Sequence, residues 1–548
     1  MSTASSPIQI TGQVVDIHSN TIFPGRVEIA DGRIVKIEAV EEAPQRYIMP
    51  GFVDAHVHVE SSMLVPSEFG RLAVVHGSVG SISDPHEIGN VLGVEGVRYM
   101  IDNGKQVPFK FYFGAPSCVP ATPFETAGAE INAADVEELL RMPEVVYLAE
   151  MMNWPGVLHK DEVVYEKLAI AKKLGKPVDG HAPGLKGEQA RAYIAAGIST
   201  DHECFTAEEA LDKLKYGMKI LIREGSAAKN FEALADLLHE HSDMMMFCSD
   251  DKHPDNLVEG HINQLVARAV AKGVDLFKAL HAASRNPVEH YGMQIGLLRE
   301  GDPADFIITS DLENFLVEET WIDGRKVAEG GKSLIPSVSN AIVNQFDCSP
   351  KSAEDFEVIA ASSKIRVIEA LDGQLITPQV DASTKVEDGL AVSDVDNDVL
   401  KIAVINRYAD ARPAIAFIKN IGLKRGAIAS SVAHDSHNII VVGVDDASMA
   451  RAANLVIEAR GGVSAVDGDT ESVVALPVAG LMSEKDGYAV AEAYSAIDRM
   501  AKEMGSPLNS PFMTLSFMAL LVIPSLKLSD KGLFDGDNFR FTGLFQIT

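Results

Sequence analysis

Short apolar runs recur from about residue 46 to residue 290, each followed by a segment of helical character. The eight runs are YIMPGFVDAHVHV, GSVGSISDPHEI, FKFYFGAPSCV, VVYLAEMMN, KPVDGHAPG, GISTDHECF, GMKILIREGS and MMMFCSDDKHP. Between them, stretches such as DEVVYEKLAIAKKLG place apolar residues at helical spacing. Eight strand-then-helix units of this total length predict a (β/α)8 (TIM) barrel. A doubly wound sheet shows the same alternation, but no GxGxxG follows the first run to support one.

Two flanking segments alternate apolar and polar residues, which is typical of half-buried strands. The first contains GRVEIADGRIVKIEAV, and the second contains GLLREGDPADFII followed by ETWIDGRKVAEGG; each has an Asp-Gly hairpin turn. We expect residues 1–48 and 292–335 to complete one β-sandwich beside a barrel of residues 49–291.

A third region, residues 336–548, contains both strand-like and helix-like patterns. Strand-like runs (LKIAVINRY, AIAFIKNIG, GAIASSVAHDSHNIIVVGV, SVVALPVAG) alternate with helix-like stretches (MARAANLVIEARGG, YAVAEAYSAIDRMAKEM). The predicted fold class is therefore α/β: a TIM barrel, a flanking β-sandwich built from both sides of the barrel segment, and a C-terminal α+β domain.

Composition limits the partners. The 548-residue chain is 46% hydrophobic and 23% charged, which is ordinary for globular proteins, and its formal net charge of −30 opposes binding to nucleic acid and to anionic membranes. The four cysteines form no CxxC pair, and the N-terminus lacks a signal-peptide pattern, so we expect a cytoplasmic protein. The uncharged stretch 505–526 is interrupted by prolines and is expected to be buried core rather than a membrane span.

Polar residues gather at the carboxyl ends of the barrel runs, where barrel enzymes place their active sites. Six of them could bind metal: His56, His58, Glu150, His181, His202 and Asp250. Taken singly, each has a plainer explanation as a solvated strand end, a structural histidine or a helix cap. At five ends of one barrel rim, imidazoles and carboxylates together suit divalent Zn, Mn or Fe(II).

These motifs resemble the amidohydrolase superfamily, through PGFVDAHVH, the later Glu, His, His and Asp, and the exit GLLREGDPADFII. Within it the chain resembles the adenine deaminase family of the bacterial type, through HVHVESSM, SDPHEIGNV, LAEMMNWPGV, DGHAPGL, IREGSAAKN, CSDDKHP and SSVAHDSHNIIVVG. These motifs cover residues 50 to 300 and recur in the last domain.

The resemblance implies two divalent ions (Mn²⁺, Fe²⁺ or Zn²⁺) at the barrel mouth. His56, His58 and Asp250 would hold the more buried ion, and His181 and His202 the other. Glu150 would bridge the two, taking the place of the carboxylated lysine found in many relatives, because each of its oxygens can bind one ion.

The implied reaction is hydrolysis of adenine to hypoxanthine and ammonia in purine metabolism. The metals lower the pKa of a bound water, and the hydroxide attacks adenine C6. Asp250 would accept the water proton and pass it to the departing amine. Glu203 is the candidate for protonating N1, and it is equally explained as a carboxylate at a helix start.

Further polar residues face the same rim. His86, Glu87 and Ser226 are candidates for binding the purine, and each of them, like Glu60, could instead support the metal ligands. Arg223 and its neighbour Glu224 could simply pair with each other.

In the third domain, two histidines stand three residues apart in AHDSHN. His434 and His437, with Asp435 between them, could form another ligand set, close over the barrel mouth, or be a turn pair without a role.

Other functions stay open. Amide hydrolysis, as in N-acetyl-sugar deacetylases or cyclic amidases, uses the same ligand types, and Arg223 could bind the substrate's phosphate or carboxylate. A non-catalytic binding protein is disfavoured because every ligand position is filled. Deaminases of nucleic-acid bases need H-x-E with P-C-x-x-C, a spacing that is absent here. The family resemblance implies a homodimer or larger homo-oligomer.

Overall fold

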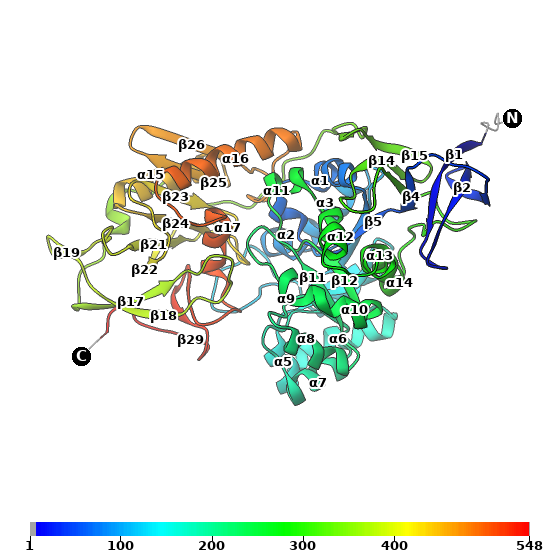
Figure 1. Ribbon diagram of the computed structural model, residues 1–548. Helices are drawn as coiled ribbons and strands as arrows, with labels where there is room; N and C mark the ends of the chain where they lie inside the picture. Colours follow the sequence, from blue (N-terminus) through cyan, green and yellow to red (C-terminus); the bar gives the residue numbers. More distant parts are fainter. Residues whose placement is uncertain (1–6, 547–548) are drawn as a thin grey trace.

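Three parts lie in a row in the computed structural model, which describes residues 7–546 (Figure 1). An N-terminal sheet occupies one end, the barrel the middle, and a C-terminal domain the other end. The outermost positions of the expected first and third regions, 1–6 and 547–548, lie outside the described residues.

The central part is a closed barrel of eight parallel strands. They are β5 (Phe52–Val57), β6 (Ser78–Ser83), β7 (Lys110–Ala115), β8 (Val145–Met151), β9 (Val178–Gly180), β10 (Thr200–Asp201), β11 (Lys219–Arg223) and β12 (Met245–Cys248). The backbone N–H of Ser199 donates to Val178 O between β9 and β10 (2.9 Å), and that of Asp250 donates to His56 O beside β12 and β5 (2.9 Å). These bonds close the ring, and each predicted strand run contains one barrel strand.

Helices follow the barrel strands and cover their outer side. They are α1 (Pro66–Ala73), α2 (His86–Leu92), α3 (Val94–Gly104), α4 (Ala133–Leu140), α5 (Trp154–His159), α6 (Glu162–Leu174), α7 (Gly187–Ala195), α8 (Ala207–Lys215), α9 (Phe231–Leu234), α10 (Leu238–His241), α11 (Pro254–Glu259), α12 (Ile262–Ala271), α13 (Leu276–Leu280) and α14 (Asn286–Tyr291).

Helix α6 shows how the sequence sets such an element. Asp161 caps its start by accepting from Val164 N, and Gly175 ends it in the left-handed conformation (φ 67°), which glycine adopts without strain. The side chains of Val164, Leu168 and Ala171 are buried at helical spacing, so the apolar stripe fixes which face packs on the barrel.

The two flanking segments form one sheet, in the order β16-β15-β14-β13-β4-β1-β2-β3. Its strands are β1 (Ile8–Asp16), β2 (Thr21–Ala30), β3 (Arg33–Ala39), β4 (Tyr47–Pro50), β13 (Phe306–Thr309), β14 (Val317–Ile322), β15 (Arg325–Glu329) and β16 (Lys332–Ser333). β4 joins the halves because it pairs with β1 on one side and with β13 on the other. Both segments thus build one structure, as expected, with all eight strands hydrogen-bonded in a single continuous sheet.

The C-terminal domain is α+β, as the sequence predicts. Its main sheet runs β18-β17-β22-β21-β24-β23-β25-β26. The strands are β17 (Lys364–Glu369), β18 (Gln379–Ser383), β21 (Val399–Ile405), β22 (Ala414–Lys419), β23 (Ala427–Ser430), β24 (Ile439–Gly443), β25 (Gly462–Asp467) and β26 (Thr470–Ala475). Small hairpins add β19 (Val386–Glu387), β20 (Leu390–Ala391), β27 (Leu526–Ser529), β28 (Gly532–Asp535) and β29 (Arg540–Phe541).

Helices cover both faces of this sheet. α15 (Asp446–Glu458) packs on one face, and α16 (Gly487–Glu503) and α17 (Pro511–Ser516) lie toward the barrel (Figure 1). The core that contains Ile428, Val442 and Phe517 is continuous with the core of the barrel, so the two parts share apolar packing. Within the uncharged stretch 505–526, residues 511–521 are all buried, as expected, whereas Pro507 and Asn509 are exposed. Among the described residues, no helix is long and apolar enough to cross a membrane.

Candidate metal centre

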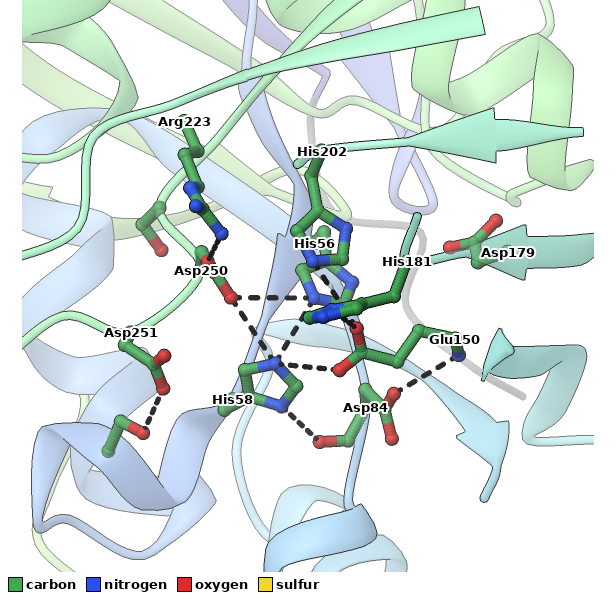
Figure 2. Close-up of polar contacts among 12 residues, drawn as sticks. His56, His58, Asp84, Glu150, Asp179, His181, His202, Arg223, Asp250 and Asp251 are labelled. Carbon is green, nitrogen blue, oxygen red and sulfur yellow. Dashed lines mark hydrogen bonds and ion pairs between the residues drawn. The ribbon is translucent and has the colours of Figure 1, made fainter. Parts of the chain in front are cut away.

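The six predicted ligands converge at the carboxyl ends of the barrel strands (Figure 2). His56 lies in β5 and Glu150 in β8, while the others follow their strands by one or two residues: His58 after β5, His181 after β9, His202 after β10 and Asp250 after β12. All six are at most 7% exposed. They meet because the strands are parallel and their carboxyl ends share one rim of the barrel.

Glu150 lies at the centre of this cluster (Figure 2). Its Oε1 is 3.3 Å from His58 Nε2, whereas its Oε2 is 2.7 Å from His181 Nδ1 and 3.3 Å from His202 Nε2. The two oxygens therefore face different groups of imidazoles, which is the arrangement that a bridging carboxylate needs.

Asp250 faces the other side of the first histidine pair. Its Oδ1 lies 3.6 Å from His56 Nε2 and 3.3 Å from His58 Nε2, and its Oδ2 accepts from Arg223 Nη1 at 2.7 Å. Since the guanidinium occupies only Oδ2, Oδ1 remains directed at the cluster.

The orientation of His58 tests whether the cluster fits a metal. Its Nδ1 lies 3.2 Å from the carbonyl oxygen of Asp84, which can only accept, so Nδ1 carries the proton. Nε2 is therefore the nitrogen left to bind an ion, and it faces the carboxylates of Glu150 and Asp250. Two buried carboxylates beside one imidazole nitrogen suit a cation, and a hydrogen bond from the other ring nitrogen to a carbonyl is typical of metal-binding histidines. The donor set thus fits divalent ions.

Charge keeps both carboxylates ionised. Although burial alone would raise it, the pKa of Glu150 is held well below its usual range by His181, His202 and His58. Burial would also raise the pKa of Asp250. The positive charge of Arg223 outweighs this effect and holds that pKa well below its usual range. Ionised carboxylates are the form that binds metal.

A layer of support that the sequence analysis missed lies behind the ligands. Asp84 accepts from the backbone N–H groups of Glu150 and His86. Asp54 accepts from Ser249 and from His261 Nε2 (2.8 Å), which explains His261 as a structural histidine. In DAHVH and SDPHE these aspartates lie two residues before a histidine. That spacing was the sequence signal that could have identified them as supporting residues.

The cluster opens into a small cavity lined from two domains. Besides the ligands, the barrel contributes His86, Glu87, Met152, Glu203, Arg223 and Asp251, and the C-terminal domain contributes Leu375, His434, Asp435, Phe517 and Leu520. The C-terminal domain therefore forms part of the cavity wall.

Three other predicted site residues are placed differently from one another. Glu203 lines the cavity, and both of its oxygens accept from Arg223. His86 also lines it, with Nδ1 3.5 Å from Glu150 Oε1. Ser226 is not among the lining residues: its hydroxyl donates to Asn256 (2.6 Å) and accepts from His253 N (2.8 Å).

Two further expectations concern carboxylates beside the rim. The expected pair of Arg223 and Glu224 is wrong, because Arg223 binds Glu203 and Asp250 whereas Glu224 binds Arg268. Neighbouring residues of a strand point to opposite faces, so the first side chain enters the barrel and the second leaves it. Glu60 is buried behind the rim, where its Oε1 accepts from Ile88 N.

Comparisons with known proteins cover nearly the whole chain. The amidohydrolase family matches residues 47–327, and the adenine deaminase C-terminal domain matches residues 374–540. A protein of Salinibacter ruber named adenine deaminase is 55% identical over 98% of this chain and 98% of its own, and one of Sulfurovum sp. is 56% identical over 97% and 99%. The chain belongs to the adenine deaminase family.

An adenine deaminase of Methanosarcina acetivorans is also similar, with 52% identity over 97% of this chain and 99% of its own. Among solved structures, an adenosine deaminase from Xanthomonas campestris with bound zinc overlaps 60% of this chain and 94% of its own at 15% identity, with a TM-score of 0.45. The C-terminal match of the adenine deaminase family includes the loop that bears His434 and Asp435.

Proposed function

We propose that this chain hydrolyses adenine to hypoxanthine and ammonia, at a site that holds two divalent ions. Membership of the adenine deaminase family supports the reaction. The single observation that carries the metal arrangement is Glu150, whose two oxygens face separate groups of histidines inside a buried cavity.

The proposed ligands follow from the contacts. His56, His58 and Asp250 would hold one ion, His181 and His202 the other, and Glu150 would bridge them. Imidazole and carboxylate ligands without a thiolate are compatible with Mn²⁺, Fe²⁺ or Zn²⁺. When bound, such ions lower the pKa of a water molecule, so that hydroxide becomes available near neutral pH.

Asp250 is proposed as the residue that moves the proton. Arg223 holds Oδ2 in place, so Oδ1 can accept the proton lost by the attacking water and later give it to the departing amine. Because the guanidinium favours the ionised carboxylate, Asp250 starts in the form that accepts.

The assignment of Glu203 changes with its contacts. Both oxygens of Glu203 already accept hydrogen bonds from Arg223, which leaves neither placed to pass a proton to adenine N1. We therefore propose that Glu203 positions Arg223, and through it Asp250.

Amide hydrolysis is less well supported. A substrate that carries a phosphate or carboxylate needs an unpaired cation, and Arg223, the arginine among the described lining residues, is neutralised by Glu203 and Asp250. A flat, uncharged purine matches the lining better, since the C-terminal domain adds the apolar side chains of Leu375, Phe517 and Leu520.

The deciding experiment is a substrate panel with metal-reconstituted enzyme. Adenine, 6-substituted purines, N-acetylglucosamine 6-phosphate and dihydroorotate are compared by ammonia release, acetate release and ring opening. Ammonia from adenine at a kcat/KM far above the other substrates is expected. Acetate release or ring opening without ammonia would instead assign an amide hydrolase.

We also propose a homodimer or larger homo-oligomer in the cytoplasm. All four cysteines are free thiols, three of them buried, which agrees with a reducing compartment. Light scattering of the purified chain at several concentrations would measure the oligomer.

A further inference from the structure

The loop between β23 and β24, residues 431–438, brings C-terminal side chains to the barrel mouth. His434 and Asp435 are each 3% exposed and line the same cavity as the proposed metal ligands. Asn438 Nδ2 donates to Thr126 O (2.9 Å), and Tyr408 OH donates to Ser436 O (2.6 Å), so the loop is tied down on both sides.

Glu87, at the start of α2, binds both histidines of this loop. Its Oε1 contacts His434 Nδ1, and its Oε2 contacts His437 Nε2. The Nδ1 of His437 accepts from Ala433 N at 3.3 Å, so the proton of that ring is on Nε2 and is donated to Glu87. Although burial opposes it, the histidines hold the pKa of Glu87 well below its usual range. A charged carboxylate thus fixes His434 through Nδ1.

The other nitrogen of His434 has no partner. Nε2 is buried without a hydrogen bond, and its nearest acidic group is Asp251 Oδ1 at 3.7 Å, which already accepts from Ser61. The ring lies against Phe517, with centroids 5.1 Å apart and planes 22° apart. Burial lowers the pKa of His434, but the charge of Glu87 outweighs this and raises it to about 9, which favours the doubly protonated ring in which Nε2 is also a donor. A buried donor without an acceptor is costly unless a ligand supplies one.

We propose that His434 contacts the substrate: its Nε2 donates a hydrogen bond to a ring nitrogen of the purine. Glu87 and His437 are positioning residues that orient it. A purine offers acceptor nitrogens at the edge of a flat ring, and Phe517 and Leu520 of the same domain supply an apolar wall for that ring. The inference rests on the proposed function, and it assigns part of the substrate site to the C-terminal domain.

A third metal ion is the competing explanation for the same residues. His86, Glu87 and Asp435 place three ligand atoms within 4.8 Å of one another. However, each oxygen of Glu87 already faces an imidazole N–H. Both oxygens of this carboxylate are thus already engaged by histidines, which favours substrate contact over metal binding.

The test separates the two nitrogens of His434. In H434N the amide nitrogen stands near the position of Nδ1 and can still bond Glu87, but the donor toward the cavity is lost. Inhibition constants of 1-, 3- and 7-deazaadenine, each lacking one ring nitrogen, are measured with wild type and H434N. We expect H434N to bind two of the analogues about 10- to 100-fold more weakly, the usual range for a charged hydrogen bond. The third analogue, which lacks the contacted nitrogen, should bind both proteins alike.

Equal changes for all three analogues, or none, would overturn the proposal. The amide of H434Q reaches toward the position of Nε2, so this variant should recover part of the selectivity lost in H434N. If H434N fails to fold, H434Q is compared with wild type, and it must discriminate less strongly between the same analogues or the proposal fails. H159Q, at an exposed histidine, is the control. Three metal ions per wild-type chain would assign the cluster to a metal instead. If the wild-type enzyme released no ammonia from adenine, the proposed function itself would fail.

Discussion

Two buried glutamates in this molecule each lie among histidines, but their surroundings differ in one respect. Beside Glu150, His58 donates its Nδ1 proton to the carbonyl of Asp84 and turns Nε2, the nitrogen left to bind an ion, toward the carboxylate. Beside Glu87, His437 accepts a backbone N–H at Nδ1 and turns an N–H toward the carboxylate. The backbone partner of the ring thus decides whether a histidine next to a carboxylate offers a metal ligand or a hydrogen-bond donor.

Metal removal should give the largest effect and affect only one of the two clusters. Chelation is expected to reduce adenine deamination to background, since the imidazole lone pairs around Glu150 then have no cation to share. Two equivalents of Mn²⁺, Fe²⁺ or Zn²⁺ should restore it, measured by ammonia release and elemental analysis. Full activity of a chain with less than one equivalent would contradict the two-ion site.

The substitution Asp250→Asn should cause the second-largest loss of activity. We expect most of the metal to remain, because His56 and His58 are unchanged, while kcat falls by about 100- to 10,000-fold through loss of the proton acceptor. Steady-state kinetics and metal content on the same preparation measure both. Near-normal turnover would remove Asp250 from its proton-transfer role.

The two glutamates can be compared directly by the same substitution. Glu150→Gln should bind fewer than two ions per chain, because an amide carries no charge to bridge them, and should lose at least about 100-fold in kcat/KM. Glu87→Gln should keep two ions and lose less activity. If the metal content of Glu150→Gln matches wild type, Glu150 does not bridge; if that of Glu87→Gln falls, the second cluster holds metal.

The smallest effect is expected at His437. In His437→Gln the amide nitrogen can replace the Nε2 donor to Glu87, whereas in His437→Asn it lies too far back. His437→Asn should therefore lower kcat/KM by about tenfold, and His437→Gln by less. Equal losses would show that the ring acts by packing alone. Thermal unfolding of both variants controls for stability.

The sequence predicted the barrel and the rim because both follow local rules. Strand runs of regular texture end in polar residues, and parallel strands bring those ends together, so His56 and Asp250 could be placed in one site from residues far apart in the chain. The contact of Glu87 with His434 and His437 follows no such rule, because it depends on how the third domain packs on the barrel. The pairing of Arg223 with Glu203 was missed for a related reason: side-chain direction at a strand end decides it, and composition does not reveal it.

The position of β4 also bears on how the chain is made. β4 lies between β1 and β13 in the N-terminal sheet, and β13 begins only at Phe306. During synthesis from the N-terminus, one edge of β4 stays unpaired until the whole barrel segment has been translated. The wall of the cavity forms later still, once His434 and Phe517 have emerged. The barrel segment therefore leaves the ribosome before the residues that cover its mouth have been made. A nascent chain stalled before Phe306 would expose the unpaired edge of β4, the kind of surface that chaperones bind.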